Sequence, residues 1–270
     1  MTTTPLHPVH LVGAGPGDPE LLTLKALRVL REATVILVDD LVGEAVLGAA
    51  LDGVAAPARI VHVGKRGGCA STPQDFIEKL MVREALAGER VVRLKGGDPL
   101  VFGRAGEEIA AARAAGLDVV VVNGITSGLV AAASLGIGWT DRRTDAQGVL
   151  LVTGHTGRDC KGQDWDAVAR VAASGVTLVI YMGISQVDAI AERLRRVLPG
   201  RLPVAVVQHA STARERSART TLDGLAALVA SEGIASPAIL IVGRVVDAAR
   251  LAGDAALAWA GREAARRVAG

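Results

Sequence analysis

Residues 9–40 read VHLVGAGPGDPELLTLKALRVLREATVILVDD, and this stretch decides the fold class. Its apolar start ends in a glycine-containing loop at 13–17, and residues 19–33 then carry apolar side chains at helical spacing. A second apolar run follows at 34–40. A strand, a helix and a second strand in this order predict an α/β fold with a largely parallel sheet.

The alternation of strand and helix patterns continues along both halves of the chain. In the first half we expect strands at 59–64, 90–98 and 117–122, and helices at 72–88 and 105–116. The second half predicts strands at 148–155, 176–183, 202–211 and 236–246, and helices at 187–198 and 222–232. The pattern changes near residues 118–125. We therefore expect an N-terminal α/β domain over 1–120, a C-terminal α/β domain over 121–250 and a helical tail over 251–270.

The composition narrows the class of protein. The 270-residue chain is 50% hydrophobic, which is typical of folded domains with apolar cores. The chain has 30 Lys and Arg and 28 Asp and Glu, so it has no broad positive field to attract nucleic acid. Only 2% of its residues are aromatic, which leaves few rings to stack on bases. The start of the chain lacks a signal-peptide pattern, and no apolar run reaches the roughly 18 residues that span a bilayer. We expect a cytoplasmic protein without a membrane or nucleic-acid partner.

The cysteines give no sign of a disulfide framework or a metal centre. Cys69 and Cys160 lie far apart in the chain, and neither belongs to a pair with metal-ligand spacing. No set of His, Cys, Asp or Glu has such spacing either. We expect free thiols and no metal.

The first glycine loop leaves a dinucleotide site and a plain turn open. Glycines between a strand and a helix let the backbone approach a ligand, as in dinucleotide-binding loops, and Asp39 stands where such proteins carry a ribose-binding acid. The third glycine of that motif would fall at residue 18, where the chain has Asp18, whose charge would repel a pyrophosphate. A tight turn without a ligand explains the glycines equally well.

Two further loops follow apolar strands. In RLKGGDPLVFGRAGEE, residues 93–108, two glycines, an aspartate and a proline occur together at a strand end, which favours a ligand site over a simple capped turn. The loop GITSG, residues 124–128, places small hydroxyl side chains at a helix start, where capping alone would explain them.

Taken in order, these motifs resemble one known family. The stretches VGAGPGDPELLTLKA (12–26), VGKRGG (63–68), RLKGGDPLVFGRAGEE (93–108), GITS (124–127) and VTGH (152–155) closely resemble uroporphyrinogen-III C-methyltransferases, over residues 9–246. The resemblance implies two α/β/α domains with a ligand cleft between them, in a homodimer. It also implies an enzyme that methylates uroporphyrinogen III at carbons 2 and 7 to give precorrin-2, for sirohaem or cobalamin, with S-adenosylmethionine as methyl donor.

The resemblance assigns roles by position. It implies contacts to the methyl donor from Pro16, Gly96, Gly97, Asp98, Val101, Thr126, Ser127, Met182 and Ala210. It implies Asp39 as proton acceptor and Lys65 as proton donor. By residue type alone, Met182 would equally fill a core, and Lys65 would equally hold a substrate carboxylate. Asp39 by itself is more typical of a helix-capping or solvated strand-end acid.

A substrate with eight carboxylates needs cations, which the motif loops supply. We expect Arg66, Arg104 and Arg142 to bind it, and Arg93, Lys95 and Arg143 also lie in or beside these loops. The chain departs from the family pattern at Asp40, Asn123, Trp139 and Thr144, which puts the particular porphyrinoid in question more than the reaction. The alternatives are methylation of a later precorrin, a nicotinamide oxidoreductase and a non-catalytic tetrapyrrole carrier.

Overall fold

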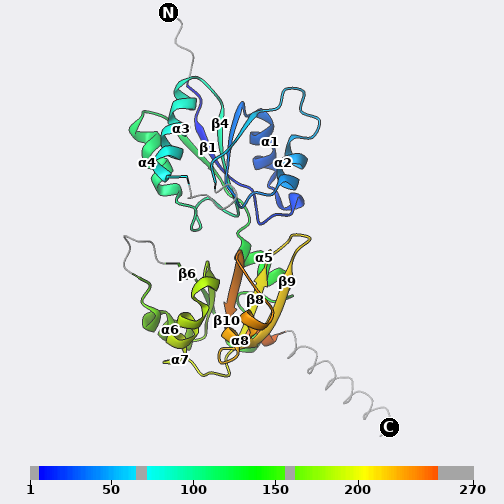
Figure 1. Ribbon diagram of the computed structural model, residues 1–270, viewed down its shortest axis with the longest axis vertical. Coiled ribbons are helices and arrows are strands. Elements are labelled where there is room, and N and C mark those ends of the chain that lie inside the picture. The colour runs from blue at the N-terminus through cyan, green and yellow to red at the C-terminus, as the bar shows by residue number, and fades with distance from the viewer. Residues whose placement is uncertain (1–5, 65–71, 156–161, 249–270) are drawn as a thin grey trace, which may run out of the picture. The chain divides into compact units, whose positions relative to one another are not determined.

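The computed structural model describes residues 6–64, 72–155 and 162–248. The chain divides into two compact units, Met1–Ser127 (unit 1) and Gly128–Gly270 (unit 2). Both are α/β, as the sequence predicted (Figure 1). The domain limits 1–120 and 121–250 stay a prediction, and the tail expected over 251–270 lies outside the described residues.

Unit 1 is built on a five-stranded parallel sheet in the order β3-β2-β4-β1-β5. The strands are β1 (Val9–Gly13), β2 (Val35–Val38), β3 (Arg59–His62), β4 (Val91–Lys95) and β5 (Val119–Val122). The helices are α1 (Leu24–Glu32), α2 (Glu44–Leu51), α3 (Gln74–Leu86) and α4 (Ala105–Ala114). Each strand was expected from its apolar run, and α2 was not.

Helices cover both faces of this sheet, α1 and α2 on one and α3 and α4 on the other (Figure 1). Alternate strand residues supply the two cores: Ile36 and Leu94 face α1 and α2, whereas Leu37 and Val91 face α3 and α4. Because β4 lies between β2 and β1, the chain reverses its direction of travel across the sheet. The loops after β1 and β4 therefore leave toward opposite faces, which makes their strand ends a typical place for a ligand.

The first predicted helix is shorter than expected. Residues 19–33 form a short 3₁₀ helix, Pro19–Leu21, and then α1, which begins at Leu24. The Thr23 side-chain oxygen accepts a hydrogen bond from the Ala26 amide at 3.1 Å and caps α1. The helix starts here because this hydroxyl satisfies an amide that has no partner within the first turn.

Unit 2 has a mixed five-stranded sheet in the order β6-β7-β10-β8-β9. Its strands are β6 (Gly148–Thr153), β7 (Val176–Tyr181), β8 (Pro203–Gln208), β9 (Arg216–Thr221) and β10 (Ala238–Val242). Its helices are α5 (Ser127–Ser134), α6 (Trp165–Ala173), α7 (Val187–Arg195) and α8 (Leu225–Ser231). Because β10 runs antiparallel to β7 and to β8, the carboxyl ends of β6, β7 and β8 share one edge.

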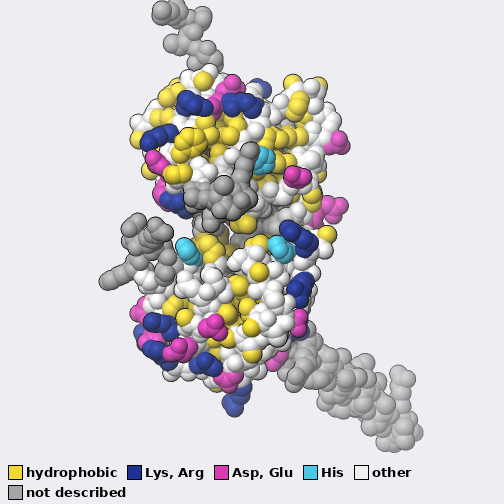
Figure 2. All heavy atoms as spheres, viewed as in Figure 1, with side chains coloured by type: hydrophobic (Ala, Val, Ile, Leu, Met, Phe, Trp, Pro, Cys, Tyr) yellow, Lys and Arg dark blue, Asp and Glu magenta, His cyan; other side chains and the backbone are white. Residues whose placement is uncertain are grey.

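The surface charges are mixed in sign, as the near balance of acidic and basic residues leads one to expect. On the face drawn in Figure 2, Lys and Arg side chains lie interspersed with Asp and Glu. Among the described residues, no helix is both long and apolar enough to cross a bilayer.

Candidate functional site

Three glycine turns of unit 1 meet at the carboxyl ends of β1, β4 and β5. A Cβ added to Gly13 would lie 2.5 Å from the Gly124 amide nitrogen and 2.6 Å from the Gly97 carbonyl oxygen. A Cβ on Gly124 would likewise collide with the Gly97 carbonyl. Only glycine permits backbones to approach this closely. The three loops singled out from the sequence are therefore brought together in one place.

Backbone hydrogen bonds fix two of these turns to each other. The Gly97 amide donates to the Gly15 carbonyl at 2.7 Å, and the Gly15 amide donates back to Gly97 at 3.2 Å. Pro16 lies directly after this bridge, and Thr126 and Ser127 lie next to Gly97. The first donor-contact residues implied by the resemblance thus share one edge of unit 1.

Asp98 links the loop after β4 to the turn after β5. The residue is 8% exposed. One carboxylate oxygen accepts from the Leu100 amide at 2.8 Å, and the other accepts from the Asn123 side-chain amide at 3.0 Å and the Gly124 amide at 3.1 Å. Asn123, a departure from the family pattern, therefore adds a hydrogen bond that proline could not donate.

Asp39 follows β2 at the same edge and lines a cavity of about 240 Å³. Its side chain is 35% exposed. Asp40, Phe102 and Arg104 also line the cavity. Arg104 forms a two-pronged ion pair with Glu107 at 2.8 and 2.6 Å. This cation at the cavity is therefore already paired with an acid of the same chain.

Two cations of β4 lie beneath Asp39 in the core. Arg93 is 2% exposed and Lys95 is 3% exposed. The Arg93 guanidinium lies 3.2 Å from the Asp39 carboxylate, and the Lys95 ammonium lies 3.9 Å from it. Both also pair with Glu108 of α4, at 2.9 and 3.0 Å. Arg93 and Lys95, grouped in the sequence with cations for the substrate, are thus buried in pairs with this chain's own acids.

Burial changes the titration of Lys95. Desolvation, followed by the nearby Arg93 charge, lowers the pKa of the Lys95 ammonium, while Glu108 and Asp39 act in the opposite direction. Glu108 itself is fully buried and was missed by the sequence reasoning. The signal was the pair of cations at alternate positions of an apolar strand, because buried charges require a buried partner.

The strand ends of unit 2 carry strained backbone. Met182 after β7 has φ +53° and His209 after β8 has φ +50°. A residue with a side chain adopts such left-handed backbone at a cost of about 1–2 kcal/mol, and such residues gather at functional sites. Met182 is 46% exposed, so it is not core filler. Ala210 follows His209 and is buried.

Two buried polar atoms flank Ala210 without a partner. Among the described residues, the Gln208 side-chain carbonyl and the Ser211 hydroxyl make no hydrogen bond. A buried polar group without a partner is costly, and such atoms commonly await a ligand or water. They mark this strand end as a place for a polar ligand.

Tyr181 and Trp139 fix the start of α5. The Tyr181 hydroxyl accepts from the Gly128 amide at 3.1 Å, and the Trp139 indole donates to the Gly128 carbonyl at 3.2 Å. A Cβ at residue 128 would collide with the tyrosine hydroxyl. Trp139, which departs from the family pattern, therefore holds this helix start.

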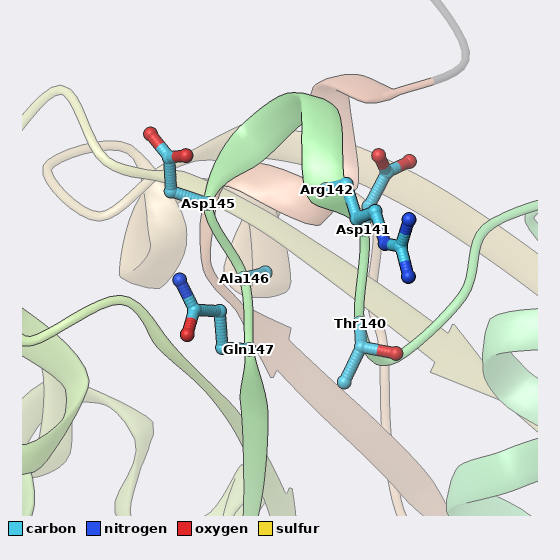
Figure 3. Close-up of a pocket in the computed structure, with 6 residues that line it drawn as sticks. All are labelled: Thr140, Asp141, Arg142, Asp145, Ala146 and Gln147. Atoms are coloured by element: carbon cyan, nitrogen blue, oxygen red, sulfur yellow. The ribbon is translucent and has the colours of Figure 1, made fainter.

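Arg142 lies in the segment of unit 2 that precedes β6. It is exposed and lines a second cavity, of about 550 Å³, with neighbours from the same loop (Figure 3). Arg143 pairs with Asp141 at 2.6 Å. Thr144 is buried, and its hydroxyl donates to the Asp141 carbonyl at 3.1 Å. Lys65 and Arg66, predicted as proton donor and substrate cation, and both cysteines lie outside the described residues.

Comparison with known proteins now identifies the family. Residues 8–226 match the family described as Tetrapyrrole (Corrin/Porphyrin) Methylases. The chain belongs to this family. Among the methylases, it is similar to the uroporphyrinogen-III C-methyltransferase of Pseudomonas aeruginosa, at 48% identity over 88% of this chain and 93% of that protein.

Two other methylases extend the comparison. The chain is 45% identical to siroheme synthase 2 of Aeromonas hydrophila, over 88% of this chain and 49% of that longer protein. Among solved structures, the uroporphyrin-III C-methyl transferase of Thermus thermophilus complexed with S-adenyl homocysteine matches with a TM-score of 0.73 and 41% identity. That match covers 89% of this chain and 93% of the other.

Proposed function

We propose that this methylase transfers methyl groups from S-adenosylmethionine to carbons 2 and 7 of uroporphyrinogen III, giving precorrin-2. The observation that carries the proposal is the meeting of Gly13, Gly97 and Gly124 at one sheet edge, next to Asp39. The 48% identity to a uroporphyrinogen-III C-methyltransferase along nearly its whole length supports the substrate.

The residues present fit the methyl donor. The donor carries an ammonium group, an amino group and ribose hydroxyls, all able to donate hydrogen bonds, and the unpartnered Gln208 and Ser211 oxygens are suitable acceptors. The solved structure of the Thermus thermophilus relative holds the demethylated donor, S-adenyl homocysteine. We assign donor contacts to Pro16, Gly96, Gly97, Asp98, Val101, Thr126, Ser127, Met182 and Ala210. When bound, the donor supplies an activated methyl on sulfur.

Asp98 contributes to this site through the backbone. Both of its oxygens already accept hydrogen bonds from the protein, so its carboxylate shapes the Gly96–Gly97 turn rather than offering a free charge. The turn can then present backbone groups to the donor, which is how glycine loops bind polar ligands.

Asp39 is assigned to the reacting substrate. Attack on the donor leaves positive charge on the tetrapyrrole, and a carboxylate beside it stabilises that charge or accepts the proton that is lost. Arg93 holds the Asp39 carboxylate from the core side, while 35% of the side chain stays exposed at the cavity. Lys65 is assigned as proton donor, and Arg66, Arg104 and Arg142 are assigned to substrate carboxylates.

The remaining assignments concern context. Precorrin-2 leads to sirohaem or cobalamin, and the likeness to siroheme synthase 2 supports the first. The matched part is about half of that relative, so only the matched half is invoked. We further propose a cytoplasmic homodimer. The dinucleotide alternative is disfavoured by Asp18. Its carboxylate accepts a hydrogen bond from the Glu20 amide at 2.9 Å and caps the first 3₁₀ helix, so a negative charge lies where a pyrophosphate would bind.

The test combines a labelled methyl donor with uroporphyrinogen III and measures the mass of the product. Two added methyl groups support the proposal, whereas methylation of a later precorrin alone would reassign the substrate. Binding of NAD in place of S-adenosylmethionine, measured by calorimetry, would reject the reaction class. Asp39→Asn should bind the donor normally and lose turnover, while Glu84→Gln, which alters a different ion-paired acid in α3, should keep it.

A further inference from the structure

Glu108 is a fully buried acid that the proposed reaction does not yet use. It lies in the first turn of α4, on the stripe that packs against the sheet with Ala105 and Ala112. One carboxylate oxygen accepts from Arg93 at 2.9 Å and from Lys95 at 3.0 Å. Among the described residues the other oxygen has no hydrogen-bond partner. An acid this deep is costly, so its retention calls for a reason beyond stability.

We propose that Glu108 is a positioning residue for Asp39, acting through Arg93 and Lys95. The inference rests on the proposed function, in which Asp39 meets the reacting substrate. Glu108 and Asp39 form two acidic ends of one buried network, and the two cations of β4 lie between them. The substrate meets Asp39 at the exposed end.

Arg93 is the rigid link of this network. Its Nε donates to Glu108, while its terminal nitrogen lies 3.2 Å from Asp39. A further nitrogen donates to the carbonyls of Leu37 and Leu94 at 3.4 and 3.3 Å, which ties the fork to β2 and β4. Because a guanidinium is planar, fixing its Glu108 side also fixes the direction of the nitrogen that holds Asp39. Lysine at this position would keep the charge and lose the fork.

Lys95 shows why the second acid matters. Its ammonium lies 3.0 Å from Glu108 and 3.9 Å from Asp39, so it bonds the buried acid and only approaches the exposed one. Without Glu108, Asp39 would be the acidic partner left in this network for both buried cations. Lys95 would then move toward Asp39, because an unpaired buried charge is strongly unfavourable. Asp39 would be drawn away from the cavity and more fully neutralised.

The test compares three single variants in the full chain with labelled methyl donor and uroporphyrinogen III. Glu108→Gln should lower kcat about 100-fold, the effect of a displacement of about 1 Å at a reacting group, and leave the KM for the donor within about three-fold. Arg93→Lys, which keeps the charge, should also lower kcat. Glu84→Gln is the matched control, since it removes the charge of another buried, ion-paired acid outside this network.

A second measurement is independent of catalysis. Glu108 and Asp39 raise the pKa of Lys95 against the lowering by burial and Arg93, so Glu108→Gln and Asp39→Asn should each lower it further. The Lys95 ammonium is followed by nitrogen NMR and assigned with Lys95→Arg. Glu107, whose own pKa Arg104 chiefly lowers, is a further charged neighbour of Lys95 and stays unchanged in all variants.

Each outcome decides the inference. Reduced kcat in Glu108→Gln and in Arg93→Lys, with a lowered Lys95 pKa, supports it. Full kcat in Glu108→Gln, or an unchanged Lys95 pKa in that variant, overturns it. If that variant does not fold, full kcat in Arg93→Lys overturns it instead. A wild-type protein without methyl transfer would reject the proposed function and the positioning role with it. An active wild type with an active Glu108→Gln rejects the positioning role alone.

Discussion

Replacing Asp98 with alanine should destabilise unit 1 by about 2–3 kcal/mol. The change leaves the Leu100 and Gly124 amides without their acceptor, and a buried unsatisfied donor costs about 1–3 kcal/mol. Two such donors would cost about 2–6 kcal/mol if fully buried, and because both hydrogen bonds are only partly buried, the sum lies at the low end of that range. The Asn123 amide, on an exposed residue, turns to water and adds little.

Asparagine at residue 98 should be nearly as harmful, although it has the size of aspartate. Its single carbonyl can accept on one side, and its amino group would then face the donors on the other. Urea unfolding followed by far-ultraviolet circular dichroism measures the loss, with Asn123→Ala as the control at about 0–1 kcal/mol. A loss below about 1 kcal/mol for Asp98→Ala, or an equal loss for Asn123→Ala, would refute this reasoning.

Three other changes test separate features. Gly13→Ala should cost about 1–3 kcal/mol in thermal unfolding and weaken donor binding, because the new Cβ meets backbone of the other two turns, whereas Gly48→Ala in α2 meets nothing and should be neutral or stabilising. Burial lowers the pKa of His10 below its ordinary value of 6.5, so the unfolded chain binds protons first on acidification. The unfolding free energy should therefore fall as the pH drops through about 6.5, and His10→Gln should remove that part of the fall in urea titrations. Tyr181→Phe removes the acceptor of the Gly128 amide and should cost about 1–2 kcal/mol, read from tryptophan fluorescence; an unchanged midpoint would contradict the assignment.

Hydrophobic periodicity was sufficient for most of the fold. The strand β2 is a continuous apolar run, and β1 and β4 are mostly apolar, because both sheet faces are buried, and such runs are visible in sequence. β9 was missed because Arg216–Thr221 is a polar edge strand that is largely exposed and shows no apolar alternation. α2 was missed because its apolar residues do not gather on one face. α6 was missed because its apolar stripe is short, and the sequence pattern did not distinguish these nine residues from the loops beside them.

The site was predictable where glycine dictates geometry. Close packing of Gly13, Gly97 and Gly124 follows from strand ends that share an edge, so the turns could be grouped before the structure was known. The partners of Arg93 and Lys95 could not be found in this way. Their acid, Glu108, sits among alanines that give a helix little amphipathic signal, and only tertiary packing shows which of Glu107 and Glu108 faces inward.

The position of β1 has a consequence for how the protein is made. Of the strands of unit 1, β1 is synthesised first, and its two neighbours in the sheet, residues 91–95 and 119–122, are synthesised long after it. Until then an apolar strand with unpaired amides waits in the nascent chain, where it can pair with other chains. Unit 1 can close its sheet only when Val122 has emerged, and slowing translation before that residue should increase aggregation.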